Sequence, residues 1–218
     1  MTTLQELMQF FSKLPGHSLI NKLESLASTP KKIGIYGGTF DPIHHGHLIL
    51  AREALETLQL EKVIFIPASV SPHKTQGQTS ASSLRLEMLQ AAIAGEATFG
   101  LDDLELRRPP PSFTIDTIEE IRKREVTAEI FYMIGEDNVQ SLQSWHRFKE
   151  LKQLVQFVVL ERTALKTCHP YPTVCRNVDI SGTDIRKRVA TGRSIRYLVP
   201  SAVEEIIVRE QLYKESTR

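Results

Sequence analysis

The stretch IGIYGGTFDPIHHGH, residues 33–47, joins a short β-rich run directly to two glycines and a group of histidines. Glycines after a strand let backbone amides approach a ligand closely, and successive amides can form an anion-binding nest. If a helix begins near this point, His44 and His47 share a face at its positive end. A phosphate there would meet backbone amides, the helix dipole and two imidazoles. The stretch therefore predicts an anion site at the end of the first strand.

Other interpretations of this stretch stay open at this point. Paired glycines after a strand are often only a tight turn, and paired histidines are often surface residues or metal ligands. The spacing of the histidines differs from the helical pair of metalloproteases, and no nearby cysteine completes a zinc site. Cys168, His169 and Cys175 share a Pro-containing segment and are interpreted as loop residues. We therefore expect no metal ligand from the protein.

Strand-like and helix-like patterns alternate through the rest of the chain. Strands are expected at 33–36, 63–66, 130–134 and 155–160, and helices at 48–58, 83–94, 114–124, around 139–151, 183–190 and 202–211. This alternation predicts an α/β fold, a Rossmann-like, doubly wound, mostly parallel sheet with helices on both faces. Ligands of such folds bind beyond the carboxyl ends of the strands, where the strand order reverses. The aperiodic segments 67–82 and 162–177 are expected to be active-site loops.

Residues 1–30 differ in pattern from the domain expected at 31–218. Their apolar residues recur at helical spacing and are interrupted at Pro15-Gly16, which predicts a short N-terminal extension of two amphipathic helices. Packing onto the domain is the first expectation for this extension. Self-association into a homo-oligomer and binding of a partner are the alternatives.

Composition excludes several classes of protein. A net charge of +1 over 218 residues gives no global basic field, so no nucleic-acid partner is expected. The apolar runs are strand-sized, far short of the roughly 20 residues that a membrane span requires. The first residues lack the pattern of a signal peptide, and two cysteines cannot form a disulfide framework. These features predict a cytoplasmic protein with reduced thiols.

Five segments, in order, resemble the HxGH nucleotidyltransferase superfamily and, within it, the bacterial nicotinate-nucleotide adenylyltransferases. The segments are Gly37–Leu48 (GGTFDPIHHGHL), Pro72–Lys74 (PHK), Ser112–Thr117 (SFTIDT), Ile134–Asn138 (IGEDN) with Trp145 downstream, and Ile180–Arg186 (ISGTDIR). The resemblance extends over about residues 32–212. Five motifs in the same order are far more specific than any one of them.

The resemblance implies transfer of AMP from ATP to the 5′-phosphate of nicotinate mononucleotide, with deamido-NAD and pyrophosphate as products. A phosphomonoester has a second pKa of about 6, so the attacking phosphate is largely ionised at neutral pH and needs no general base. The catalytic residues that the resemblance implies, His44, His47 and Arg186, would therefore stabilise charge. Mg²⁺ is expected to be bound through the ATP phosphates.

The resemblance also divides the remaining site residues between the two substrates. Those implied for ATP are Gly37, Gly38, Thr39, Phe40, His44, His47, Gly135, Asp137, Ser181, Thr183 and Arg186. Asp137 would contact the ribose, and Ser181 or Thr183 would cap a helix whose amides face the β- and γ-phosphates. Those implied for the acceptor are Lys74, Phe113, Thr114 and Trp145, with Trp145 stacked on the pyridine ring. Phe113 stands where the family often has Tyr, so a hydroxyl is lost there.

Other functions remain open at this stage. The same chemistry could use nicotinamide mononucleotide, phosphopantetheine or a cytidylyl acceptor. Phosphopantetheine transferases usually carry Thr where this chain has His44, and class I aminoacyl-tRNA synthetases are longer. A nucleotide-binding regulator without turnover is the alternative from a different class, and the presence of both histidines and Arg186 argues against it.

Overall fold

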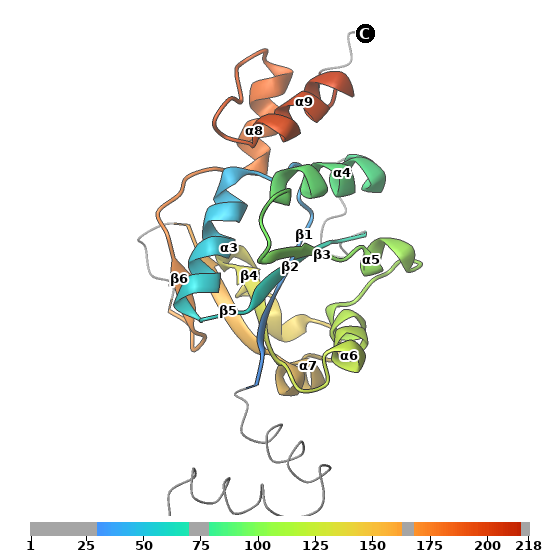
Figure 1. The fold of residues 1–218 in the computed structure, drawn as a ribbon, viewed down its shortest axis with the longest axis vertical. Helices are drawn as coiled ribbons and strands as arrows, with labels where there is room; N and C mark the ends of the chain where they lie inside the picture. Colours follow the sequence, from blue (N-terminus) through green and yellow to red (C-terminus); the bar gives the residue numbers. More distant parts are fainter. Residues whose placement is uncertain (1–29, 70–78, 163–167, 215–218) are drawn as a thin grey trace, which may run out of the picture. The chain divides into compact units, whose positions relative to one another are not determined.

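The computed structural model describes residues 30–69, 79–162 and 168–214, and Figure 1 shows how their elements are arranged. The two helices expected within residues 1–30 lie outside these ranges, as does Lys74. In the part of the chain that is described, no helix is both long enough and apolar enough to cross a membrane.

A parallel sheet of six strands forms the centre of the described domain. Its strands are β1 (Lys32–Gly38), β2 (Lys62–Pro67), β3 (Phe99–Leu101), β4 (Glu129–Gly135), β5 (Gln156–Glu161) and β6 (Thr173–Cys175). Their order is β3-β2-β1-β4-β5-β6, and every neighbouring pair is parallel. This is a doubly wound sheet, so the predicted fold class is confirmed.

The strand order reverses between β1 and β4. β1 pairs with β2 on one side and with β4 on the other, and Tyr36 lies opposite Met133 in the second pairing. Gly37 and Gly38 end β1, and Gly135 ends β4, so glycines gather at the carboxyl edge of the reversal point. Ligands of doubly wound folds bind at this position.

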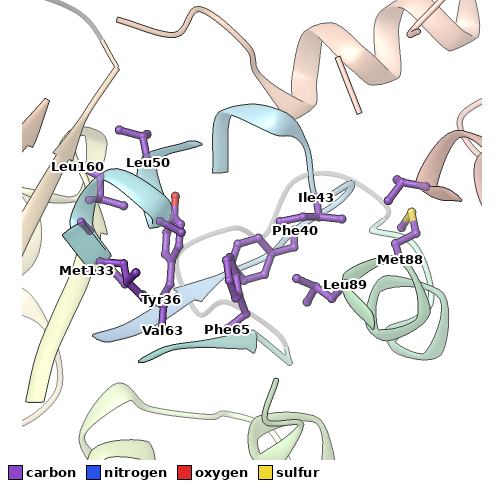
Figure 2. Packing of buried hydrophobic residues seen from close by; sticks show 14 of the residues in the cluster. Tyr36, Phe40, Ile43, Leu50, Val63, Phe65, Met88, Leu89, Met133 and Leu160 are labelled. Carbon is purple, nitrogen blue, oxygen red and sulfur yellow. The ribbon is translucent and has the colours of Figure 1, made fainter. Parts of the chain in front are cut away.

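Helices cover both faces of the sheet. They are α3 (His45–Thr57), α4 (Ser82–Ile93), α5 (Leu104–Arg107), α6 (Thr114–Arg124), α7 (Phe148–Leu154), α8 (Gly182–Ala190) and α9 (Ser201–Arg209). Side chains alternate between the faces: Ile33 and Ile35 join the core beneath α6 and α7, whereas Tyr36 joins the core beneath α3 and α4. Figure 2 shows Tyr36, Phe40 and Phe65 packed together in the second of these cores.

The prediction of a helix around 139–151 is wrong over most of its length. The chain there forms two 3₁₀ turns, η1 (Glu136–Asn138) and η2 (Leu142–Ser144), before the short helix α7. Arg147 interrupts the helical path with a left-handed backbone, at φ 52°. Its side chain is held there by bonds to Glu119 and Glu150, both at 2.7 Å.

Three short elements escaped the sequence analysis. β3 and β6 have three residues each and α5 has four, too few to show a period. β6 lies inside the segment 162–177 that was expected to be entirely loop, so that expectation is corrected. Pairing with β5 makes Thr173–Cys175 part of the scaffold.

Candidate active site

The loop that leaves β1 is shaped by the aromatic ring of Phe40. Phe40 has a left-handed backbone, at φ 48°, and its buried ring covers Gly38 so closely that a Cβ there would lie 2.9 Å from it. The ring also makes an edge contact with His47 at 5.1 Å between centroids. Because the Phe40 side chain belongs to the core, only its backbone can serve a ligand.

His44 and His47 form a stacked pair at the start of α3. His44 is the N-cap residue and His47 is the third residue of the helix, and their ring centroids are 3.7 Å apart. The His44 backbone N–H donates to His47 Nδ1 at 3.3 Å. This bond fixes the orientation of the His47 ring beside that of His44 at the first turn of the helix.

His44 is buried, with 1% of its surface exposed. Burial, with a smaller contribution from the nearby positive charge of Arg162, lowers the pKa of His44 to about 3. The residue is therefore neutral at pH 7 without a ligand. Its ring crowds Gly46, where a Cβ would lie 3.0 Å from His44 Nδ1 and 3.3 Å from the Ile180 carbonyl oxygen. A side chain at this position would require the His44 ring or the Ile180 backbone to shift.

The segment Ile180–Arg186, which the resemblance assigns to the β- and γ-phosphates, begins α8 close to the loop that follows β1. We call Gly37–Leu48 and Ile180–Arg186 the first and second phosphate motifs, after the role that the resemblance implies. Ser181 is the N-cap, and its Oγ accepts from the Asp184 N–H at 3.1 Å. Arg186 donates to the Asp41 backbone carbonyl at 2.7 Å and to Thr183 Oγ1 at 3.3 Å. Two segments whose bonded residues are 145 positions apart in sequence are thus joined, and α3 and α8 both begin near this junction.

A cavity of about 580 Å³ opens at the strand-order reversal. Some of its lining residues are among those implied for ATP, namely Gly37, Gly38, Thr39, Gly135 and Asp137. Others are among those implied for the acceptor, namely Phe113, Thr114 and Trp145. Members of both sets, taken from separate motifs, therefore line one cavity. The stacked histidines and the start of α8 are not among its described lining residues. Lys74 lies outside the described residues.

Buried polar groups that sequence reasoning missed also line this cavity. Tyr132 points its hydroxyl at Thr114 Oγ1, 3.5 Å away, and burial raises the pKa of Tyr132 above its ordinary value. Glu105 accepts from Thr117 Oγ1 at 2.8 Å, and burial raises its pKa too. Trp145 packs its ring at 87° to that of Tyr132. The missed lining residues are Ala68, Glu105, Ser112, Tyr132, Ile134, Asn138, Ser141, Ser144 and His146.

Arg85 is a second feature that the sequence did not reveal. It lies on α4 with 1% of its surface exposed, and burial lowers the pKa of its guanidinium. The guanidinium donates to the carbonyls of Thr39 at 2.9 Å, Ala68 at 2.8 Å and Ser80 at 3.2 Å. It therefore ties the loops that follow β1 and β2 to the start of α4. A single arginine within a helical pattern normally indicates a solvent-exposed residue. No signal in the sequence could therefore have identified Arg85 as a buried link between these loops.

Comparisons with known proteins show which family this chain is similar to. The cytidylyltransferase-like family model matches residues 35–188. A protein of Geobacillus thermodenitrificans named probable nicotinate-nucleotide adenylyltransferase is 44% identical over 189 residues, which cover 85% of this chain and 88% of the relative. One of the same name from Exiguobacterium sibiricum is 43% identical over 187 residues, 84% of this chain and 98% of the relative.

A solved structure supports the fold independently. The Plasmodium falciparum nicotinic acid mononucleotide adenylyltransferase complexed with NaAD superposes with a TM-score of 0.70. The match covers 84% of this chain and 97% of the other, at 20% identity. At that identity the likeness concerns the fold alone.

Proposed function

Since this chain belongs to the nicotinate-nucleotide adenylyltransferase family, within the cytidylyltransferase-like group, we propose that it transfers AMP from ATP to nicotinate mononucleotide. The products are deamido-NAD and pyrophosphate, which places the reaction in NAD biosynthesis. The observation that carries this proposal is the bond between Arg186 and the Asp41 carbonyl, because it joins the two phosphate motifs at the reversal point of the sheet. A cytoplasmic location is part of the same proposal.

Adenylyl transfer to a phosphate requires the protein to position the substrates and stabilise charge, and it does not require a general base. The attacking oxygen belongs to a phosphate that is already largely ionised at pH 7. As it adds to the α-phosphorus of ATP, negative charge builds on the α-phosphate oxygens. Fixed donors aimed at that charge lower the barrier. His44 and His47, stacked at the positive end of α3, are the proposed donors.

The α8 segment is proposed to hold the β- and γ-phosphates. Ser181 and Thr183 lie in its first turn, where backbone N–H groups lack partners within the helix. The bonds of Arg186 to Asp41 and Thr183 use two of the five N–H donors of a guanidinium, and the other donors are proposed to bind phosphate oxygens. Departure of pyrophosphate would be assisted by this positive charge.

The cavity is proposed to hold the nicotinate nucleotide and the ribose of ATP. Trp145 offers a ring face, and Thr114 offers a hydroxyl and the first amides of α6. Phe113 keeps the ring of the family's usual tyrosine, and Lys74 would add a positive charge. Gly135 has no Cβ, which leaves room for the Asp137 carboxylate beside it, since a Cβ there would lie 2.5 Å from Asp137 Oδ1. That carboxylate suits the ribose hydroxyls.

Mg²⁺ fits this site as an ion carried by ATP. The Asp41 carboxylate lies at the junction of the two phosphate motifs, and both of its oxygens already accept hydrogen bonds, from Tyr213 and from Ser80. Within the described residues, no group of three carboxylate, histidine or cysteine side chains is arranged to hold a metal. Phosphate oxygens and water would supply the ligands, and the ion would neutralise part of the triphosphate charge.

The acceptor assay tests this function. The full chain is incubated with ATP, Mg²⁺ and one acceptor at a time: nicotinate mononucleotide, nicotinamide mononucleotide, phosphopantetheine or a cytidylyl acceptor with CTP. We expect deamido-NAD and an equal amount of pyrophosphate only with nicotinate mononucleotide. Preference for nicotinamide mononucleotide would overturn the acceptor assignment, and the absence of pyrophosphate with every acceptor would overturn catalysis.

A further inference from the structure

Asp41 is the junction of three separate segments near the two phosphate motifs. It lies in the loop between β1 and α3 with 7% of its surface exposed. Its Oδ1 accepts from the Tyr213 hydroxyl at 2.5 Å, and its Oδ2 accepts from the Ser80 N–H at 3.1 Å. Its backbone carbonyl accepts from Arg186 at 2.7 Å. The side chain and the carbonyl of one residue are thus held by different parts of the chain.

Tyr213 comes from the turn that follows α9. That helix packs on α4, and the ion pair of Arg209 with Glu87 at 2.7 Å joins the two. Tyr213 adopts a left-handed backbone, at φ 61°, and packs against the hydrophobic core. Burial raises the pKa of Tyr213, and its bond to Asp41 raises it further, so the hydroxyl keeps its proton at working pH.

The carbonyl of Asp41 also meets the start of α8. A Cβ on Gly182 would lie 3.3 Å from this oxygen and 3.3 Å from Arg186 Nη1. The bond of 2.7 Å from Arg186 and the close approach of Gly182 hold the Asp41 carbonyl against the first residues of α8. Any group that fixes the Asp41 side chain therefore also fixes where its carbonyl holds the Arg186 guanidinium.

We propose that Tyr213 is a positioning residue for adenylyl transfer. Its hydroxyl holds the Asp41 carboxylate, and the Asp41 carbonyl in turn orients Arg186 toward the triphosphate. The proposal rests on the proposed function, in which Arg186 binds ATP phosphates. It extends the catalytic machinery to the turn after α9, which forms no part of the described cavity lining.

Tyr213→Phe in the full chain removes only the hydroxyl. We expect kcat for nicotinate mononucleotide to fall about tenfold, because misplacement of a charged donor by a fraction of an ångström weakens transition-state contacts. The KM for nicotinate mononucleotide should stay unchanged, because the cavity is lined by other residues. Tyr197→Phe is the matched control, since Tyr197 is 78% exposed and stacks on Arg196 at the surface. It should leave kcat unchanged.

A double-mutant cycle with Arg186→Lys separates positioning from general stability. If Tyr213 acts through Arg186, the double variant should be little slower than Arg186→Lys alone, because the guanidinium that Tyr213 positions is already gone. Thermal unfolding of each variant is measured beside turnover. Additive losses in the cycle, or a lower Tm with unchanged kcat, would overturn the proposal. A wild-type chain inactive on nicotinate mononucleotide overturns the proposed function instead, and the cycle is then run with the acceptor it does use.

Discussion

The two phosphate motifs differ in how deeply they are built into the protein. In the first, His44 and Asp41 are buried, and Phe40 and Arg85 hold the surrounding loop from the core side. In the second, Ser181 is half-buried and Thr183 is exposed at the start of α8. The buried motif carries a neutral imidazole, and the surface motif carries a guanidinium. Burying an uncompensated charge is costly, so the Arg186 guanidinium proposed for the phosphates is only half-buried, whereas the buried Arg85 guanidinium is compensated by carbonyl acceptors.

Removing an imidazole from the first phosphate motif should lower kcat more than any other change considered for the two motifs. His47→Ala is expected to lower kcat by about a thousandfold, the order found when a preorganised donor to a developing charge is lost. The dissociation constant for ATP should change little, because the donor acts mainly on the transition state. Single-turnover rates and calorimetric binding of ATP check both parts. Thr183→Ala, at the surface motif, is the control and should lose far less; near-normal turnover of His47→Ala would remove the histidine from the mechanism.

Replacing one glycine by alanine in each motif compares how much crowding the two motifs tolerate, with smaller expected losses of kcat. Gly46→Ala presses a Cβ against the buried His44 ring and the Ile180 carbonyl, so we expect about a tenfold loss of kcat. Gly182→Ala meets the end of the Arg186 side chain, which can shift, although the Asp41 carbonyl is equally close. Its loss should be a few-fold. Gly100→Ala, where the nearest atom is 3.7 Å away, controls for the substitution itself. Equal losses at Gly46 and Gly182 would contradict the contrast.

The last prediction concerns stability and pH rather than turnover. The folded pKa of His44 is about 3 and its ordinary value is 6.5, so between these values the unfolded chain binds a proton that the folded chain does not. Stability is therefore fully present above pH 6.5 and falls as the pH drops toward 3, by at most about 1.4 kcal/mol per pH unit from this residue. His44→Gln should flatten the dependence in urea unfolding from pH 7 to pH 4.5. A slope identical to that of the wild type would assign acid sensitivity to other groups.

Much of the fold followed from local patterns. Short apolar runs predicted β1, β2, β4 and β5, and periodic apolar residues predicted α3, α4, α6, α8 and α9. Patterns failed where elements were only three or four residues long, and around Trp145, where bonds from distant side chains hold Arg147 in a left-handed conformation. Tertiary contacts there override a helical propensity that a window of sequence would favour.

For the candidate site, the sequence by itself determined which residues lie one helical turn apart and which follow a strand. His44 and His47 had to share a face once α3 began at His45, because 3.6 residues make a turn. Only the tertiary structure shows that Arg186 donates to the carbonyl of Asp41 and that Arg85 is buried. It alone also shows that the Tyr213 hydroxyl donates to the Asp41 carboxylate. Spacing along the chain constrains only near neighbours. Contacts between residues more than a hundred positions apart depend on the strand order and on how the helices pack over it.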